Sequence, residues 1–138
     1  MHGASYVNAC APYEKSRLRT ALLKSAVKNA EKAWEAINAL LCSKPSIKNR
    51  TYVAGLVGDT VKEHVDSTGS GPTVSTVGSS NDLVEAIMAN GSAWDVTLRL
   101  ETQSLTVQYF KDEACVQEIN LVLNRQRWVI NEIGQACD

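Results

Sequence analysis

The stretch Trp94–Ile133, WDVTLRLETQSLTVQYFKDEACVQEINLVLNRQRWVINEI, decides the fold because it reads as four consecutive β-strands. Apolar and polar residues alternate over 94–101, which is typical of a strand with one face toward a core and one toward water. The run 105–109 repeats this alternation after a short polar connection. A register that sets Leu100 opposite Leu105 gathers the large apolar residues of both strands on one face.

Two further runs extend the predicted sheet. The run Cys115 to Leu123 follows a turn-like segment at 111–114, and pairing Val107 with Ile119 continues the same apolar face. The run 127–133 is rich in β-forming residues but carries apolar residues on both faces, so its register stays open. Short connections between the four runs predict an antiparallel meander, whose apolar face needs a cover.

The segment 12–42 is expected to supply that cover as one long amphipathic helix. Pro12 suits a first helical position, and no glycine or other proline interrupts the segment before Pro45. A coiled-coil seam with another chain is the less favoured interpretation, because the repeat is short. The apolar stripe recurs at helical spacings of three and four, at Leu23, Val27, Ala30, Trp34, Ile37 and Leu41.

The segments between this helix and the sheet are less regular. Residues 48–66 are predicted to form a second helix, because their valines recur at helical spacing, although Gly55 and Gly58 weaken a helix there. The Ser-, Thr- and Gly-rich segment 67–80 indicates a mobile loop or an edge segment. Ser80 or Asn81 then caps a short helix. The predicted class is α+β: a long N-terminal helix plus one or two shorter helices packed on a four-stranded antiparallel meander. We expect one domain over residues 1–138, helical over 12–90, with the sheet over 94–135.

Charge is distributed unevenly along the chain. Up to Arg50 there are nine Lys or Arg against three Glu, and after it five against twelve acids, for a total of −1. Charge complementarity within the fold and a solvated helix face explain this better than nucleic-acid binding, because the aromatic residues are not interleaved with the basic ones. The nucleic-acid interpretation would use Arg17, Arg19, Lys24, Lys28 and Lys32.

Neither a membrane span nor a leader is evident in the sequence. No stretch reaches the roughly 18 apolar residues of a span, and the N-terminus lacks the apolar core of a signal peptide. Such a start suits a processed protein without its leader as well as a cytosolic one.

The four cysteines are compatible with two disulfides in an oxidising compartment, and reduced, buried thiols are the alternative. A hairpin turning at 124–126 would set Cys115 opposite residue 135 or 136, close to Cys137, so we predict a Cys115–Cys137 bridge. Cys10 and Cys42 bracket the long helix, which would hold them more than about 40 Å apart and prevent their pairing. The spacing matches no zinc motif, so we expect no metal and no cofactor.

His64 is the only histidine in the interior of the sequence, with Glu63 and Asp66 beside it. A histidine oriented by a carboxylate could act as a general base. Neighbours in sequence do not face each other on a helix, and no nucleophile or oxyanion motif accompanies them. A surface histidine is therefore the default interpretation, and we predict no catalytic residue.

Two groups of residues have a structural and a functional interpretation. Three tryptophans could line a pocket between helix and sheet, but core packing explains them better; they are Trp34, Trp94 and Trp128. Four charged residues at the hairpin tips fit solvated turns, or else a partner-binding edge on a rigid sheet. They are Asp112, Glu113, Arg125 and Arg127.

A long helix, further helical material and a closing meander resemble the cystatin-like and nuclear-transport-factor-2-like (NTF2-like) superfamilies. The last predicted strand, RWVINEI at 127–133, is similar to the Trp-x-Ile-Asp/Asn-x-Ile ending of small bacterial secreted members. The resemblance implies a helix lying across a curved sheet. Its superfamilies include enzymes, ligand binders and immunity proteins, so fold alone selects no function. The segment 67–80 departs from the pattern, and the Asp-His arrangement of the enzymatic members is missing.

The expected function is a non-enzymatic, protein-binding module of the bacterial envelope, periplasmic or secreted. An immunity-type inhibitor that occludes the active site of a toxin is its specific form. A homodimer is compatible with this expectation, and nucleic acid is not an expected partner. The alternative is a small-ligand-binding or enzymatic pocket protein with His64 as the titrating group.

Overall fold

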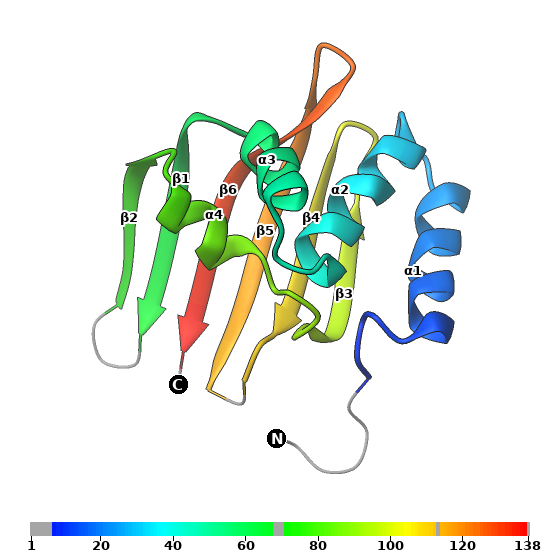
Figure 1. Cartoon of the computed structure of the whole chain (residues 1–138), viewed down its shortest axis with the longest axis horizontal. Coiled ribbons are helices and arrows are strands. Elements are labelled where there is room, and N and C mark those ends of the chain that lie inside the picture. The colour runs from blue at the N-terminus through cyan, green and yellow to red at the C-terminus, as the bar shows by residue number, and fades with distance from the viewer. Residues whose placement is uncertain (1–6, 68–70, 113, 138) are drawn as a thin grey trace.

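The computed structural model describes residues 7–67, 71–112 and 114–137, which form four helices and a six-stranded sheet. In Figure 1 the helices α2, α3 and α4 cover one face of the sheet, and α1 lies beside α2 beyond the β3 edge. The strand order is β2-β1-β6-β5-β4-β3, in which β1 and β6 are parallel and all other neighbours are antiparallel. Along the chain the elements are α1 (Pro12–Lys24), α2 (Ala30–Cys42), α3 (Ile47–Leu56), β1 (Val57–Ser67), β2 (Gly71–Gly78), α4 (Asn81–Ile87), β3 (Trp94–Leu100), β4 (Ser104–Phe110), β5 (Cys115–Asn124) and β6 (Arg127–Cys137).

The meander from β3 to β6 confirms the strand prediction. Leu100 pairs with Leu105, and Val107 with Ile119, as the alternation indicated. The α+β class is therefore correct. The four-stranded meander is too small a sheet, because β1 and β2 add two strands and make the sheet mixed.

The predicted Cys115–Cys137 disulfide is present, and a bulge in β6 explains why the two cysteines face each other. Asn120 pairs with Glu132 but Leu121 pairs with Ile130, so one extra residue shifts the register by one place. Cys115 therefore lies opposite Cys137, at a Cα–Cα distance of 4.1 Å.

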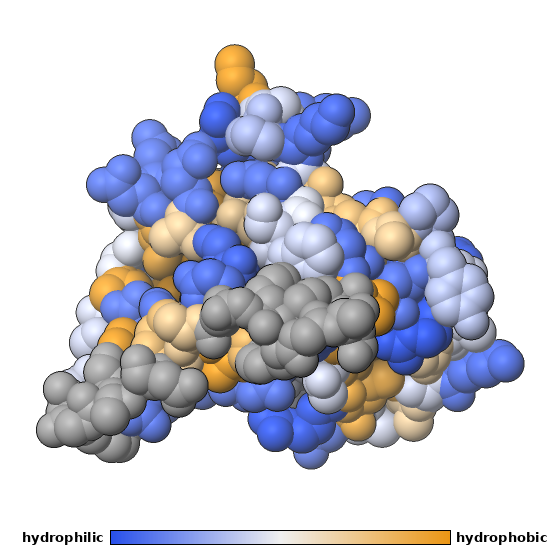
Figure 2. Space-filling view, turned by 90° about the horizontal axis from the view of Figure 1, so that it is seen from below, coloured by the Kyte–Doolittle hydropathy of each residue, from blue (hydrophilic) through white to orange (hydrophobic). Residues whose placement is uncertain are grey.

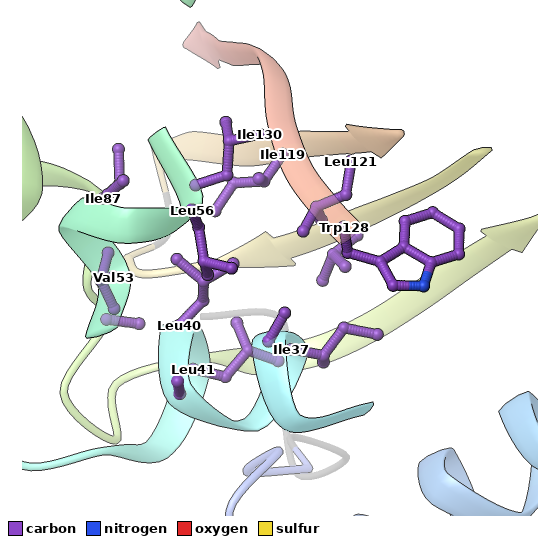
Figure 3. Packing of buried hydrophobic residues seen from close by; sticks show 14 of the residues in the cluster. Ile37, Leu40, Leu41, Val53, Leu56, Ile87, Ile119, Leu121, Trp128 and Ile130 are labelled. Carbon is purple, nitrogen blue, oxygen red and sulfur yellow. The ribbon is translucent and has the colours of Figure 1, made fainter. Parts of the chain in front are cut away.

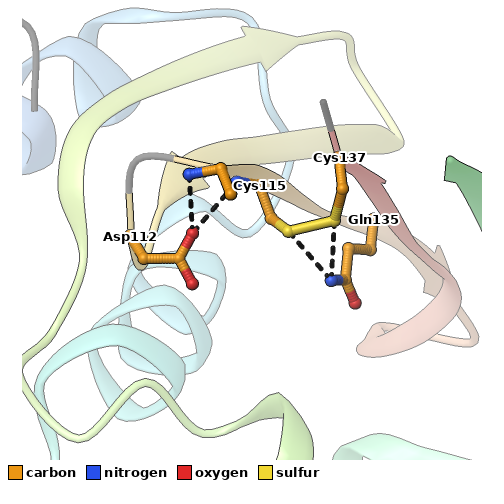
Figure 4. Close-up of a disulfide and its surroundings, with 5 residues drawn as sticks. Asp112, Cys115, Gln135 and Cys137 are labelled. Carbon is orange, nitrogen blue, oxygen red and sulfur yellow. Dashed lines mark hydrogen bonds between the residues drawn. A yellow bond between two sulfur atoms is a disulfide. The ribbon is translucent and has the colours of Figure 1, made fainter. Parts of the chain in front are cut away.

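Side chains around this disulfide fix the adjoining turn (Figure 4). The Gln135 amide donates to both sulfurs, at 3.3 and 3.0 Å. The Asp112 carboxylate accepts hydrogen bonds from the backbone N–H groups of Ala114 and Cys115. The Asp112 side chain therefore stabilises the start of β5 through hydrogen bonds to its own turn.

The prediction of a single helix over 12–42 is wrong, because the chain breaks between α1 and α2. The Ser25 hydroxyl donates to the Leu22 carbonyl at 2.6 Å, and Asn29 adopts a left-handed φ of 53°. The Lys28 N–H donates to the Thr102 carbonyl of the β3–β4 connection. These contacts replace helical hydrogen bonds and fold α2 back over the sheet.

That break reverses the cysteine prediction for the N-terminal half. With the helix folded back, Cys10 and Cys42 form a disulfide with a Cα–Cα distance of 5.5 Å. The prediction that these two residues cannot pair is therefore wrong. The bridge ties the segment before α1 to the end of α2.

The predicted second helix over 48–66 is correct only in its first half. Ser46 caps α3 by accepting from the Asn49 N–H, and the chain turns into a strand at Val57. The spacing of Val57, Val61 and Val65 is four residues, which fits one face of a helix and one face of a strand equally well. The segment 67–80 contributes β2, as its edge-segment interpretation predicted, and Ser80 caps α4.

The core lies between the helices and the covered face of the sheet (Figure 3). Trp128 is 4% exposed and its indole N–H donates to the Asn29 carbonyl at 3.1 Å, so core packing is confirmed for this tryptophan. Tyr109 is 2% exposed, and burial raises its pKa to about 12. Figure 3 labels ten residues of this cluster, which are Ile37, Leu40, Leu41, Val53, Leu56 and Ile87 of the helices and Ile119, Leu121, Trp128 and Ile130 of β5 and β6.

A non-reducing peptide map is expected to identify both disulfides, Cys10–Cys42 and Cys115–Cys137. Replacing Cys10 and Cys42 together with alanine should lower the free energy of unfolding by on the order of 3 kcal/mol, because the unfolded chain regains the freedom of the 32-residue loop. Urea denaturation of the double variant against the native chain measures the loss. A map that joins Cys10 to Cys115 or Cys137 would contradict this arrangement of the helices.

A buried carboxylate on α1 gives the fold a pH dependence. Glu14 is 5% exposed and accepts two hydrogen bonds from Arg17, which hold its pKa below the usual value. A lowered pKa in the folded state stabilises the fold above the unfolded-state pKa of about 4.3, and the stabilisation is lost as pH falls below it. Glu14→Gln should therefore be less stable than the native chain at pH 7, and the difference should shrink by pH 3. An equal difference at both pH values in denaturant titrations would count against this role.

Candidate functional site

The sheet face turned away from the helices, here called the open face, carries the polar half of each alternating strand. In Figure 1 the helices α2, α3 and α4 lie in front of the sheet, so the open face is the far side. One cross-strand row on it runs Gln108, Glu118, Gly134 and His64, through the pairings of β4, β5, β6 and β1. Four strands that are distant in sequence thus supply neighbouring side chains.

The open face is hollowed into a depression of about 540 Å³, here called the sheet trough. Its charged lining residues are His64, Asp66, Arg99, Glu118 and Glu132. A depression with a wide opening, whose lining mixes charged, polar and apolar residues, differs from an enclosed apolar pocket for a small molecule.

Gly134 lies in the floor of the trough, between the side chains of His64 and Glu118. A Cβ added there would be 3.7 Å from the His64 Cβ and 3.8 Å from the Glu118 Cβ, which is ordinary contact distance. The missing side chain at this position therefore leaves room between His64 and Glu118.

Two acid–base contacts organise the charges of the trough. His64 Nε2 lies 3.0 Å from Glu132 Oε1, and the two side chains are 42% and 36% exposed. This nitrogen is shielded from solvent and makes no directed hydrogen bond among the described residues, so the contact is an ion pair only when the imidazole is protonated. Arg99 lies 3.4 Å from Glu118. With Asp66 added, acids outnumber permanent cations in the trough.

A second hollow of about 460 Å³ lies between α2, α3 and the β5–β6 turn. Its lining includes Trp128, Tyr52, Glu35, Lys32 and Arg127. Burial and the nearby Glu35 carboxylate raise the pKa of the Tyr52 hydroxyl. The lining mixes both signs of charge, so it selects no particular ligand charge.

The described hairpin-tip residues of the predicted partner-binding set lie at two separate turns. Arg125 and Arg127 lie where β5 ends and β6 begins, whereas Asp112 precedes the start of β5. Figure 1 shows these two connections at opposite ends of β5. Glu113 is outside the described residues. Whether either tip binds a partner stays a prediction.

His64 belongs to a strand, which changes its neighbours from those the sequence suggested. Glu63 points to the helix side, whereas Glu132 and Glu118 approach His64 from β6 and β5. Sequence reasoning missed both acids as site residues. Their signal is the polar place that each occupies between apolar residues in an alternating strand, which marks the open face.

Several basic residues of the helices form ion pairs with acidic residues of the helices. Arg17 contacts Glu14, Arg19 contacts Glu31, and Lys32 contacts Glu35. These contacts agree with the interpretation of the basic segment as a solvated helix face.

Two classes of feature are absent from the part of the chain that the structure describes. No group of three or more His, Cys, Asp or Glu side chains within it has the arrangement of a metal site. Nor does any helix in those ranges have the length and hydropathy needed to cross a membrane.

Comparisons with known proteins bear on the fold alone. No protein-family model matches the sequence, and neither does any curated protein. Among solved structures, an NTF2-like protein with a cystatin-like fold from Novosphingobium aromaticivorans is similar over 93% of this chain and 90% of its own, at 13% identity and a TM-score of 0.44. An NTF2-like protein of unknown function from Silicibacter pomeroyi is similar over 89% and 98%, at 11% identity and a TM-score of 0.45.

A de novo designed protein with a curved β-sheet is also similar, over 78% of this chain and 96% of its own, at 12% identity and a TM-score of 0.47. The NTF2-like and cystatin-like resemblance predicted from the sequence is thus confirmed as a likeness of fold. At these identities it implies neither an activity nor a ligand.

The trough residues are expected to be dispensable for folding, unlike the residues directly behind them. His64→Ala and Glu132→Gln should each change the free energy of unfolding by less than about 1 kcal/mol, because a half-exposed ion pair contributes little. Leu121→Ala, on the covered face at 0% exposure, should cost about 2–5 kcal/mol. Urea denaturation of the three variants compares the two faces, and a trough variant as damaging as Leu121→Ala would make the trough structural.

Proposed function

We propose that this chain is a non-enzymatic, protein-binding module that holds a basic surface of a partner protein against the sheet trough. The observation that carries the proposal is an uncovered, acid-lined depression on a rigid sheet. Its rigidity comes from six hydrogen-bonded strands and from the Cys115–Cys137 bridge between β5 and β6.

The chemistry of the trough supports a protein partner over a small molecule. The charged side chains of its ion pairs are 36% to 75% exposed, and its opening is wide, so water would surround a small ligand on one side. A protein surface can cover the whole depression and displace that water. Complementary charge then gives orientation and a fast encounter, with Glu118, Glu132 and Asp66 facing basic groups of the partner.

The two disulfides support an oxidising compartment such as the periplasm or the extracellular space. In that setting the specific form of the proposal is an immunity-type inhibitor that covers the active site of a toxin. An acidic face suits a toxin whose active site is basic, as required for binding phosphate-rich substrates.

The rival function is a ligand-binding or enzymatic pocket protein with His64 as the titrating group. One observation favours it, since the sheet trough reaches His64. That hollow lies on the open face and not under the helices, and none of its charged residues is buried. We therefore rank this function second.

The test is a binding titration against the secreted and envelope proteins encoded beside the gene of this chain. Reversing two trough acids, in Glu118→Lys/Glu132→Lys, should weaken the complex at least about tenfold, because like charges then meet across the interface. The matched control is Glu31→Lys/Glu85→Lys, which makes the same change of charge at two exposed, ion-paired acids of the helical layer. Calorimetry measures both affinities.

If both double variants lose affinity for the partner equally, or if neither loses affinity, the trough is not the contact surface. Failure of every neighbouring protein to bind would contradict the immunity-type form. Turnover of a small molecule that His64→Ala abolishes would establish the rival function instead.

A further inference from the structure

The strand β2 forms one edge of the sheet, and after Pro72 its sequence contains no residue that protects this edge. In Figure 1 no element lies beyond β2. Its central run Thr73–Val77, TVSTV, is β-branched or small throughout and carries no charge, and Val74 is 60% exposed. Proteins usually protect an edge with lysine, proline, a bulge or a covering segment, because unpaired strand edges associate, and the only such residue in β2 is Pro72 near its start.

The phase of the β1–β2 pairing shows which backbone groups face outward. The Ser79 N–H donates to the Asp59 carbonyl at 3.0 Å, which makes 59 and 79 a hydrogen-bonded pair. Hydrogen-bonded and non-hydrogen-bonded pairs alternate along an antiparallel ladder. The N–H and C=O groups of Val74, Thr76 and Gly78 therefore point away from β1, and no hydrogen bond from their outer side is found among the described residues.

The opposite edge of the sheet is covered at its start by the chain itself. Beside β3, Asn8 forms an antiparallel bridge with Trp94, and the Asp95 N–H donates to the Val7 carbonyl at 2.8 Å. The strand is also bulged between Trp94 and Thr97. The covered start and the bulge of β3 oppose the addition of a second molecule's β2 edge at this side of the sheet, which disfavours open-ended fibres.

We infer that two copies of this chain pair antiparallel through β2, with Thr76 opposite the Thr76 of the second copy. In that register Val74 faces Gly78 of the second copy, so every outward donor and acceptor of the three residues finds a partner. Pro72, which has no N–H to donate, stays outside the hydrogen-bonded pairs. A bare edge that meets only another bare edge closes as a two-fold dimer.

Charge does not oppose this pairing. The nearest charged residue on the open face is Lys62, which pairs with Thr76 inside one molecule. Two Lys62 side chains would then be three strand spacings apart, about 14 Å, beyond the screening length of about 8 Å at physiological salt. The two-fold axis is perpendicular to the sheet, so both troughs face the same side of the dimer.

Analytical ultracentrifugation of the full chain measures the dimer dissociation constant. The concentration should range from about 1 µM to about 1 mM, because a contact of one strand per copy is smaller than a standard interface and binds weakly. Thr76→Lys places two cations opposite each other and should raise the dimer dissociation constant at least about tenfold. Gln108→Lys adds the same charge to an exposed position of β4 on the same face and should leave it unchanged.

A second pair of variants keeps the test independent of folding defects. All four native cysteines are in disulfides, so Thr76→Cys introduces the single free thiol. Mild oxidation should link it into a covalent dimer, while Gln108→Cys should stay monomeric on a non-reducing gel. A chain that is monomeric at about 1 mM, or a dimer that both lysine variants retain, overturns the inference without affecting the proposed trough contact.

Discussion

The structure depends on one register constraint, the alignment of β4, β5 and β6 that sets apolar residues in cross-strand rows. Leu105, Leu121 and Ile130 form one such row, and Val107 and Ile119 begin the next. Because successive side chains point to opposite faces, a slip of one residue would turn every one of these side chains into water. The same constraint that makes the core therefore assigns Glu118, and with it the trough, to the open face.

Leaving one sheet face uncovered reduces the apolar area that a chain of 138 residues can bury. The two disulfides offset this reduction by restricting the unfolded chain. One joins the segment before α1 to the end of α2, and the other joins β5 to β6 near the C-terminus. On the face shown in Figure 2, hydrophobic residues lie in separate small patches among hydrophilic ones, as expected where apolar groups are mostly covered.

Local patterns predicted the meander, the short α4 helix and the Cys115–Cys137 bridge, because each depends on neighbours in sequence. The break between α1 and α2 has no local signal, since helix propensity continues through Ser25–Asn29 and the break is stabilised by the distant Thr102 carbonyl. The strand β1 was missed because its valines fit two periodicities and its parallel partner β6 lies far along the chain. The trough combines His64 with Glu132 through that same pairing, so sequence alone offered His64 and the wrong neighbours.

The sheet has one face buried under the helices and one face exposed to water. The alternating side chains of β5 show this difference most directly. Nuclear magnetic resonance with a soluble paramagnetic agent measures the exposure of its side chains one by one. The account predicts strong broadening for Glu118 and Asn120 and little for Ile119 and Leu121, which are 2% and 0% exposed. Uniform broadening, or the reverse alternation, would contradict it.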